Sequence, residues 1–304
     1  MFILIIVLLS EKMNSLTELP YDVQQILLQF LVERCDISFI VLSHVNQLYY
    51  RLTTNLVHKM NLTNRGLTIK RCVNCHDIAA KGYLGVLQWA RSMNRSWNAG
   101  TCINAARYGH LDVLKWARLY KCHWNAKVCS AAALNGHLEV IKWTCKNNLT
   151  IDIQKVVSNA ALHGHLNVLV WIHQNGYKIG VWMSEYAARG GHLDILIWAK
   201  KNGLNWNYRI CINAAFGGHI DILIWAIENG CEWDPQIYNI VAERGHREIL
   251  TWALDNNYDS PQYVCDAAVH GNQLDILLWT LANGFRLSPY WEFVARQKWP
   301  VIFQ

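Results

Sequence analysis

Tryptophans recur at a fixed interval along most of the chain, and this spacing constrains the fold more than any other feature. They are Trp89, Trp116, Trp143, Trp171, Trp198, Trp225, Trp252 and Trp279. Six of the seven intervals between them are 27 residues long, and one is 28. A sequence period of about 20–50 residues is typical of a solenoid, in which each unit packs only on its neighbours. We therefore interpret these tryptophans as structural residues of eight repeats, packed in the core.

The first half of each repeat predicts a short helix. In the copy that contains Trp225, Cys211, Ala214 and Ala215 fall at positions i, i+3 and i+4, so they share one helix face. All three are small, which lets a neighbouring helix approach closely. Gly218 follows them and suits a left-handed stop, because glycine has no Cβ to oppose a positive φ.

The second half of each repeat predicts another helix, which begins near His219. Asp221 lies in its first turn, where a carboxylate complements the helix dipole. Asn229 and Gly230 then suit its end. The apolar residues form two stripes, Ile220, Leu223 and Ile224 on one and Ile222, Trp225 and Ala226 on the other. We expect an all-α solenoid of stacked helix–turn–helix units, each second helix being covered on two sides.

The repeat resembles the ankyrin repeat over residues 74–285. Its Ala-Ala-x-x-Gly-His-Leu-(Asp/Glu)-(Val/Ile)-Leu core and closing Asn-Gly match the two helices of that family. Ankyrin repeats run to about 33 residues and carry a Thr-Pro-Leu-His turn, which this chain lacks. The shorter period places the missing residues in the β-turn finger between repeats. The resemblance implies stacked helix pairs that act as a protein-interaction scaffold.

Arrays of such shortened repeats, with tryptophan in the second helix, resemble those of giant mimivirus-like DNA viruses that infect amoebae. This likeness implies that the partners are host proteins. The chain has 10 cysteines with no disulfide framework, which favours a reducing compartment. Together these features predict the host-cell cytoplasm as the place of action.

The segment before the array, residues 14–56, does not follow the repeat and predicts a small module of three short helices. Pro20 fits the first position of a helix, and apolar residues from Val23 to Leu31 then recur at helical spacing. Ile37–Leu42 and Val45–Leu52 are read as the other two helices. A core of this size gives only marginal stability by itself, so we expect the module to pack on the first repeat or on a partner.

This module resembles an F-box. The matching residues are Leu19, Pro20, Tyr21, Asp22, Val23, Ile26, Leu27, Leu31, Asp36, Val45, Tyr49 and Leu52. Asn46 and Gln47 depart from the family, which usually has Cys-Lys or Cys-Arg there. The resemblance implies that the linker protein of cullin–RING ubiquitin ligases binds Leu19, Pro20, Ile26, Leu27 and Leu31. The alternative is a plain helical cap that shields the first repeat.

The remaining segments flank these two parts. Residues 1–13 contain the apolar run Phe2–Leu9, which is far shorter than the roughly 20 residues that span a bilayer. We interpret 1–13 as a leader or a mis-called start, the alternatives being a secretory signal or a segment that packs on the fold. Residues 57–73 read as a polar, basic linker, and residues 286–304 as the terminal cap that a repeat array needs.

Two constellations raise the question of metal binding, and neither predicts a site. Cys72-x-x-Cys75-His76 has the spacing of half a zinc site, but no second pair follows, and Cys75 occupies the repeat position of Cys102 and Cys129. The periodic histidines lie on stacked helices about 8–10 Å apart, whereas metal ligands lie about 2 Å from the ion. They are His110, His137, His165, His192, His219 and His246. We therefore expect no metal and no cofactor.

Charge and motifs also limit the function. The net charge is +6, from 28 basic and 22 acidic residues that are scattered along the chain, so nucleic acid is not an expected partner. The chain has no phosphate-binding loop and no nucleophile elbow. The sequence predicts a non-enzymatic interaction protein that binds neither membrane nor nucleic acid. It would be a substrate adaptor of a ubiquitin ligase or, alternatively, a plain scaffold or host-factor decoy.

Overall fold

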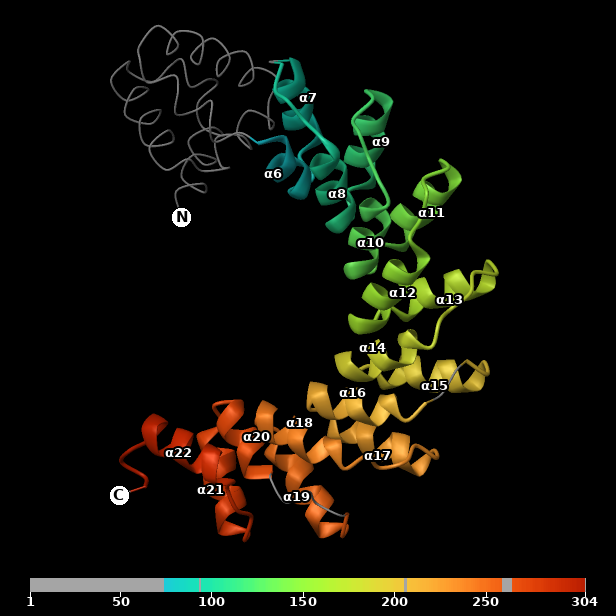
Figure 1. The fold of residues 1–304 in the computed structure, drawn as a ribbon. Coiled ribbons are helices and arrows are strands. Elements are labelled where there is room, and N and C mark those ends of the chain that lie inside the picture. The colour runs from blue at the N-terminus through green and yellow to red at the C-terminus, as the bar shows by residue number, and fades with distance from the viewer. Residues whose placement is uncertain (1–73, 93, 205–206, 259–263, 304) are drawn as a thin grey trace, which may run out of the picture. The chain divides into compact units, whose positions relative to one another are not determined.

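The computed structural model describes residues 74–303, apart from 93, 205–206 and 259–263. The segments predicted as leader, F-box-like module and linker (1–13, 14–56 and 57–73) lie outside the described residues, as does Cys72. The described part of the chain consists of helices and short connections, with no strand (Figure 1). This confirms the all-α, stacked-pair fold that the repeat predicts.

The chain divides after Val128 into two compact units. The helices of the first unit are α6 (Cys75–Ala80), α7 (Leu84–Ser92), α8 (Ala99–Arg107) and α9 (Leu111–Leu119), while α10 (Lys127–Leu134) begins just before the division. The second unit contains α11 (Leu138–Lys146), α12 (Ile153–Leu162), α13 (Leu166–Gln174), α14 (Trp182–Gly190), α15 (Leu193–Lys201), α16 (Arg209–Gly217), α17 (Ile220–Glu228), α18 (Gln236–Arg244), α19 (Arg247–Asp255), α20 (Val264–His270), α21 (Leu274–Ala282) and α22 (Pro289–Lys298). From α6 to α21 these helices form the eight predicted pairs.

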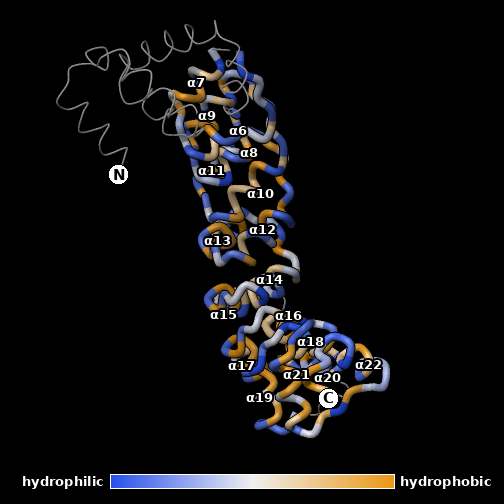
Figure 2. The backbone as a smooth tube through the Cα atoms, turned by 90° about the vertical axis from the view of Figure 1, so that its left-hand side faces the viewer, coloured by the Kyte–Doolittle hydropathy of each residue, from blue (hydrophilic) through white to orange (hydrophobic). Residues whose placement is uncertain are grey.

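The first helices of the pairs stack directly on one another. In the second unit α12 packs on α14, α14 on α16, α16 on α18 and α18 on α20, and in the first unit α6 packs on α8. The first helices α6, α8, α12, α14, α16, α18 and α20 also pack on the second helices of their own pairs, so that first and second helices form two layers within each unit (Figure 1). Apolar and polar residues alternate along the helices of both layers (Figure 2).

The core lies between the two layers, where small and branched side chains meet. In the pair α16–α17, Cys211, Ala214 and Ala215 of the first helix are fully buried, as the repeat predicts. The buried residues of the second helix are Ile222, Leu223 and Ala226. The prediction that two apolar stripes are both covered is therefore wrong in part. A single buried stripe combines residues of both, while Ile220, Ile224 and Trp225 at its margins are only half-buried.

The repeat tryptophans are margin residues rather than core residues. Each one whose side chain is described, from Trp116 to Trp279, is half-buried, which corrects the expectation of core packing. Their rings pack on the connections between pairs: the centroid of Trp116 lies 5.4 Å from that of Trp97, which precedes α8, and the centroid of Trp252 lies 5.5 Å from that of Tyr258, which follows α19. The second helix packs mainly on its own first helix. The tryptophan therefore lies at the margin of this contact and covers it from outside.

The turn inside each pair ends the first helix in the predicted way. Gly218 has a φ of 79°, and the N–H of His219 donates to the carbonyl of Ala214 at 3.0 Å. A bond from a residue to the carbonyl five positions earlier, across a left-handed glycine, is the Schellman motif. Asn272 takes the place of this glycine in the last pair, with a φ of 61°.

The connection between pairs is a short loop without a strand. At the end of α17 the side-chain amide of Asn229 donates to the carbonyl of Trp225 at 2.7 Å, and Gly230 has a φ of 91°. Asp234 then accepts a bond from the N–H of Gln236 and caps α18. The described connections thus replace the β-turn finger by one capped turn, which accounts for the shorter period.

In five pairs a histidine at the start of the second helix joins the pair to the preceding one. His192 stands over Gly164, where an added Cβ would lie 2.6 Å from its ring, and its Nε2 lies 3.0 Å from the carbonyl oxygen of Leu162. A carbonyl oxygen only accepts, so Nε2 must carry the hydrogen. Within the two units this bond joins His110 to Ala80, His165 to Leu134, His192 to Leu162, His219 to Arg189 and His246 to Phe216.

Two glycines of one repeat allow this histidine contact to be tested. Gly164 and Gly176 both have positive φ values, 79° and 74°, so alanine strains the backbone similarly at either position, by about 1–2 kcal/mol. An added Cβ meets His192 only at Gly164; at Gly176 nothing lies within 4 Å. We expect Gly164→Ala to destabilise the chain by at least about 1 kcal/mol more than Gly176→Ala. Urea unfolding followed by circular dichroism measures the difference, and equal midpoints would contradict the contact.

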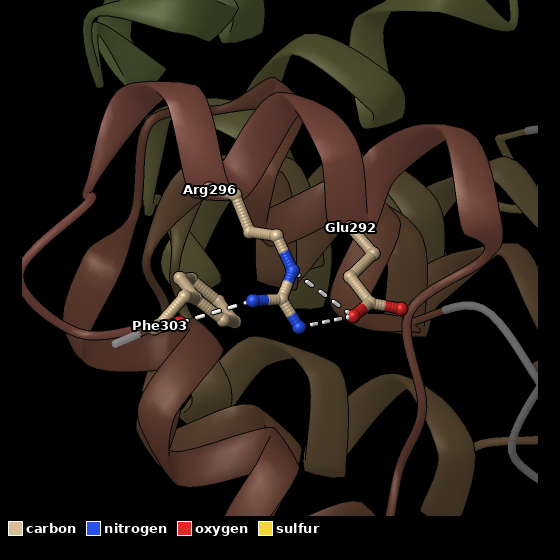
Figure 3. A network of polar contacts seen from close by, with 3 residues as sticks. All are labelled: Glu292, Arg296 and Phe303. Carbon is tan, nitrogen blue, oxygen red and sulfur yellow. Dashed lines mark hydrogen bonds and ion pairs between the residues drawn. The ribbon is translucent and has the colours of Figure 1, made fainter.

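The last helix, α22, differs from the other first helices on one face. Glu292 and Arg296 stand two repeat lengths after the buried Tyr238 and Ala242. Arg296 donates to Glu292 at 2.7 Å and, through Nη1, to the carbonyl of Phe303 at 3.0 Å (Figure 3). An ion pair thus stands where a middle repeat has packing residues. The assignment of residues 286–304 as a terminal cap stays a prediction, which the following variant tests.

Placing the residues of a middle repeat on α22 should expose an apolar surface through which copies of the chain associate. We expect Glu292→Tyr with Arg296→Ala to raise the apparent mass in light scattering as the protein concentration rises, because end repeats need a polar outer face for solubility. The control is Glu139→Ala with Lys142→Ala, which removes a comparable ion pair from α11. A double variant of α22 as monodisperse as this control would show that α22 is not a cap.

Candidate interaction surface

The sequence-predicted site residues fall into two groups. Leu19, Pro20, Ile26, Leu27 and Leu31 lie outside the described residues. The repeat tryptophans belong to the second helices and serve the packing of each pair. A cluster of exposed aromatic and arginine side chains that could contact a partner lies instead at the ends of the first helices α14, α16 and α18.

Two aromatic side chains are exposed at the N-terminal ends of α14 and α16. Trp182 is 53% exposed and Tyr208 is 52% exposed. The guanidinium carbon of Arg209 lies over the ring of Trp182, 6.0 Å from its centroid. Glu185 lies close by but is buried, and it accepts a bond from the side-chain amide of Asn207 at 3.0 Å. This end therefore offers aromatic and cationic groups to a partner.

Two arginines lie over one phenylalanine ring at the C-terminal ends of α14, α16 and α18. The guanidinium carbon of Arg189 is 4.0 Å from the centroid of Phe216, and that of Arg244 is 3.4 Å from it. Cation–π attraction holds both positive groups against the ring. Glu243 is beside Arg244 in the chain, but its carboxylate contacts Nδ1 of His270 at 3.2 Å. Among the described residues, no ion pair joins a carboxylate to Arg189 or Arg244.

The two ends belong to one continuous face. Trp182 and Arg189 are seven residues apart on α14, as are Arg209 and Phe216 on α16, and this spacing places each pair on one side of its helix. Because α14 packs on α16 and α16 on α18, the residues lie on adjacent helices. We call this face the arginine–aromatic surface. It consists of Trp182, Arg189, Tyr208, Arg209, Phe216 and Arg244.

Sequence reasoning missed this surface because the repeat was read for what its copies share. Arg189, Phe216, Glu243 and His270 stand at one repeat position, 27 residues apart, and no two of them are alike. Three positions later the copies have His192, His219, His246 and Gln273. The surface could have been found by looking for a repeat position at which the residue type varies. In the structure this position lies at the C-terminal ends of the first helices.

The cysteines do not form a reactive centre in the described residues. Cys75, Cys102, Cys129 and Cys211 lie in the core, as their repeat position predicts. No group of three or more His, Cys, Asp or Glu side chains there could hold a metal ion. In two repeats a first-helix thiol is paired with a thiol of the following loop, Cys102 with Cys122 and Cys211 with Cys231.

Hydrogen bonding within each pair moves the two pKa values apart. The bond from Cys211 lowers the pKa of Cys231 and raises that of Cys211, and burial raises the pKa of Cys211 further. The same causes lower the pKa of Cys122 and raise that of Cys102. A lowered pKa favours the thiolate, but Cys122 and Cys231 are only 1% and 5% exposed, so reagents cannot reach them.

Thiol labelling tests whether exposure or pKa decides reactivity. Burial raises the pKa of Cys145, which favours the unreactive thiol at neutral pH, but Cys145 is more exposed than Cys231. We expect N-ethylmaleimide at pH 7.5 to modify Cys145 well before Cys231, as followed by peptide mass spectrometry. Raising the pH towards 9 should speed the reaction of Cys145, since deprotonation then increases. Faster labelling of Cys231 in the folded chain would show that its loop opens readily.

None of the described helices is long and apolar enough to cross a membrane. No protein-family model matches the chain, and no curated protein matches its sequence. Among solved structures, the chain is similar to the crystal structure of the human ASB11 ankyrin repeat domain, at 15% identity and a TM-score of 0.43. That match covers 53% of this chain and 85% of the other.

Proposed function

We propose that this protein is a non-enzymatic protein-interaction scaffold, in which the repeat array holds side chains for a partner. The observation that carries this proposal is that some positions of the repeat keep their residue type from pair to pair while another position varies. Histidine, glycine and asparagine positions that join helices are repeated from pair to pair. The repeat position three residues before that of the histidine holds six residue types in the eight copies, although the surrounding backbone is the same: Ala80, Arg107, Leu134, Leu162, Arg189, Phe216, Glu243 and His270. A rigid layer with variable side chains is suited to recognition.

The exposed groups favour a protein as the partner. Tryptophan, tyrosine and arginine dominate the binding energy of protein–protein interfaces, because they combine a large contact area with polar ends. The arginine–aromatic surface has two exposed aromatic side chains, Trp182 and Tyr208, close to arginines. The host-cell cytoplasm and a viral source remain part of this proposal, through the resemblance of the shortened repeats.

The second part of the proposal concerns residues 14–56. Their F-box-like pattern supports a role as an adaptor, in which Leu19, Pro20, Ile26, Leu27 and Leu31 bind the linker protein of a cullin–RING ubiquitin ligase. The array would then present a bound target for ubiquitination. The alternative is a plain scaffold or host-factor decoy, in which the N-terminal module only caps the first repeat.

A pull-down of the purified host linker protein tests the adaptor role. Wild type should bind it, and Leu27→Asp should abolish binding, because an unpaired charge in an apolar contact is very costly. The matched control is Leu119→Asp, since Leu119 is 75% exposed in the array and should tolerate the charge. Circular dichroism of all three proteins should show equal helix content.

The possible outcomes separate the alternatives. No binding by wild type would reduce residues 14–56 to a cap. Equal binding by wild type and Leu27→Asp would show that the binding face has been misplaced. If Leu27→Asp lost binding and also unfolded the array, Leu27 would belong to the core.

A further inference from the structure

We propose that the arginine–aromatic surface binds an acidic, extended peptide segment of the partner, with one carboxylate placed beside the edge of the Phe216 ring, where it reaches both Arg189 and Arg244. This inference rests on the proposed scaffold function and names the chemistry of its partner. It concerns residues of the second unit only, so it is independent of the adaptor role of residues 14–56.

The charges at the C-terminal end of the surface are the first argument. The guanidinium carbons of Arg189 and Arg244 lie 4.0 and 3.4 Å from the centroid of Phe216, one on each face of the ring, so their separation is at most the sum of these distances. No described carboxylate forms an ion pair with either. Like charges at such a distance repel, and a carboxylate placed beside both guanidinium groups removes the repulsion. Arginine and carboxylate also fit each other through two parallel N–H···O bonds. The arrangement therefore favours an anionic side chain.

The backbone around these arginines is fixed, which is the second argument. The carbonyl of Arg189 accepts a bond from Nε2 of His219 at 3.2 Å, and the carbonyl of Phe216 accepts one from His246. Glu243, the nearest acidic neighbour in the chain, is engaged by His270. The pair is thus positioned before a ligand arrives, and little order has to be created on binding.

The distance between the two ends of the surface suggests the form of the ligand. Arg209 and Phe216 are seven residues apart on α16, which corresponds to about 10 Å along a helix. An extended peptide advances about 3.3 Å per residue, so two acidic side chains about three residues apart would reach both ends. Trp182 and Tyr208 would then contact apolar residues of the same segment at the N-terminal end.

A selection from a random peptide library tests this proposal although the partner itself is unidentified. The full chain is immobilised, and a displayed library of 12-residue peptides is selected on it and on the variant Arg189→Gln/Arg244→Gln. Peptides enriched on wild type should carry Asp or Glu pairs about three residues apart. They should be lost from the selection on the variant.

Affinity measurements on the most enriched peptide, labelled with fluorescein, provide the quantitative test. We expect Arg189→Gln/Arg244→Gln to weaken binding at least tenfold in fluorescence anisotropy. Lys178→Gln/Lys201→Gln removes the same charge from other positions of the same unit, and it should change the affinity less than twofold. Replacing the glutamates or aspartates of the peptide by their amides should also weaken binding at least tenfold.

Four results would overturn the inference. Enriched peptides without acidic residues, or acidic peptides that bind the arginine variant as well as wild type, would leave the scaffold function standing but place its site elsewhere. A single-stranded oligonucleotide that binds wild type more tightly than the selected peptide, and loses affinity in the arginine variant, would assign the surface to nucleic acid instead. If no peptide were enriched, the proposed scaffold function would fail together with the inference.

Discussion

The contact between a histidine and the glycine of the preceding pair is the interaction on which the rest of the structure depends. The ring fills the space that a Cβ would take at Gly164 or Gly191. The same ring donates to the carbonyl at the end of the preceding first helix, which would otherwise lack a partner. Glycine is therefore needed twice at this position, for its positive φ and for the histidine that covers it. One residue type thus ends a helix and joins two repeats.

This contact explains why a stable array can leave other positions variable. Stability comes from bonds and burial that are repeated in each pair, such as the Asn229 amide on the Trp225 carbonyl and the buried Ile222 and Leu223. The side chains at the ends of the first helices take no part in these contacts, so they can differ. The arginine–aromatic surface is one result of that freedom, and it requires three neighbouring repeats, since Arg189, Phe216 and Arg244 come from α14, α16 and α18.

Local features were predictable from the sequence because they depend on neighbours in the chain. The small residues Cys211, Ala214 and Ala215 are buried as their helical spacing indicates, and Gly218 is left-handed. Features that depend on contacts with another repeat could not be predicted from the sequence. The recurrence of the tryptophans placed them in the core, whereas the second helices are covered mainly by their own first helices. A residue such as Trp171 is therefore left at the margin. The partners of the histidines lie about 30 residues away, where no local pattern indicates them.

A double-mutant cycle on Gly164 and His192 tests the central claim most directly. Gly164→Ala strains the backbone and displaces the ring, while His192→Ala removes the ring and its bond to the Leu162 carbonyl. In the double variant the collision is absent. We predict that it is less destabilised than the sum of the single variants by at least about 1 kcal/mol, within the range found for residues in contact. Additive free energies of unfolding, as expected for Gly176→Ala combined with His192→Ala, would contradict the account.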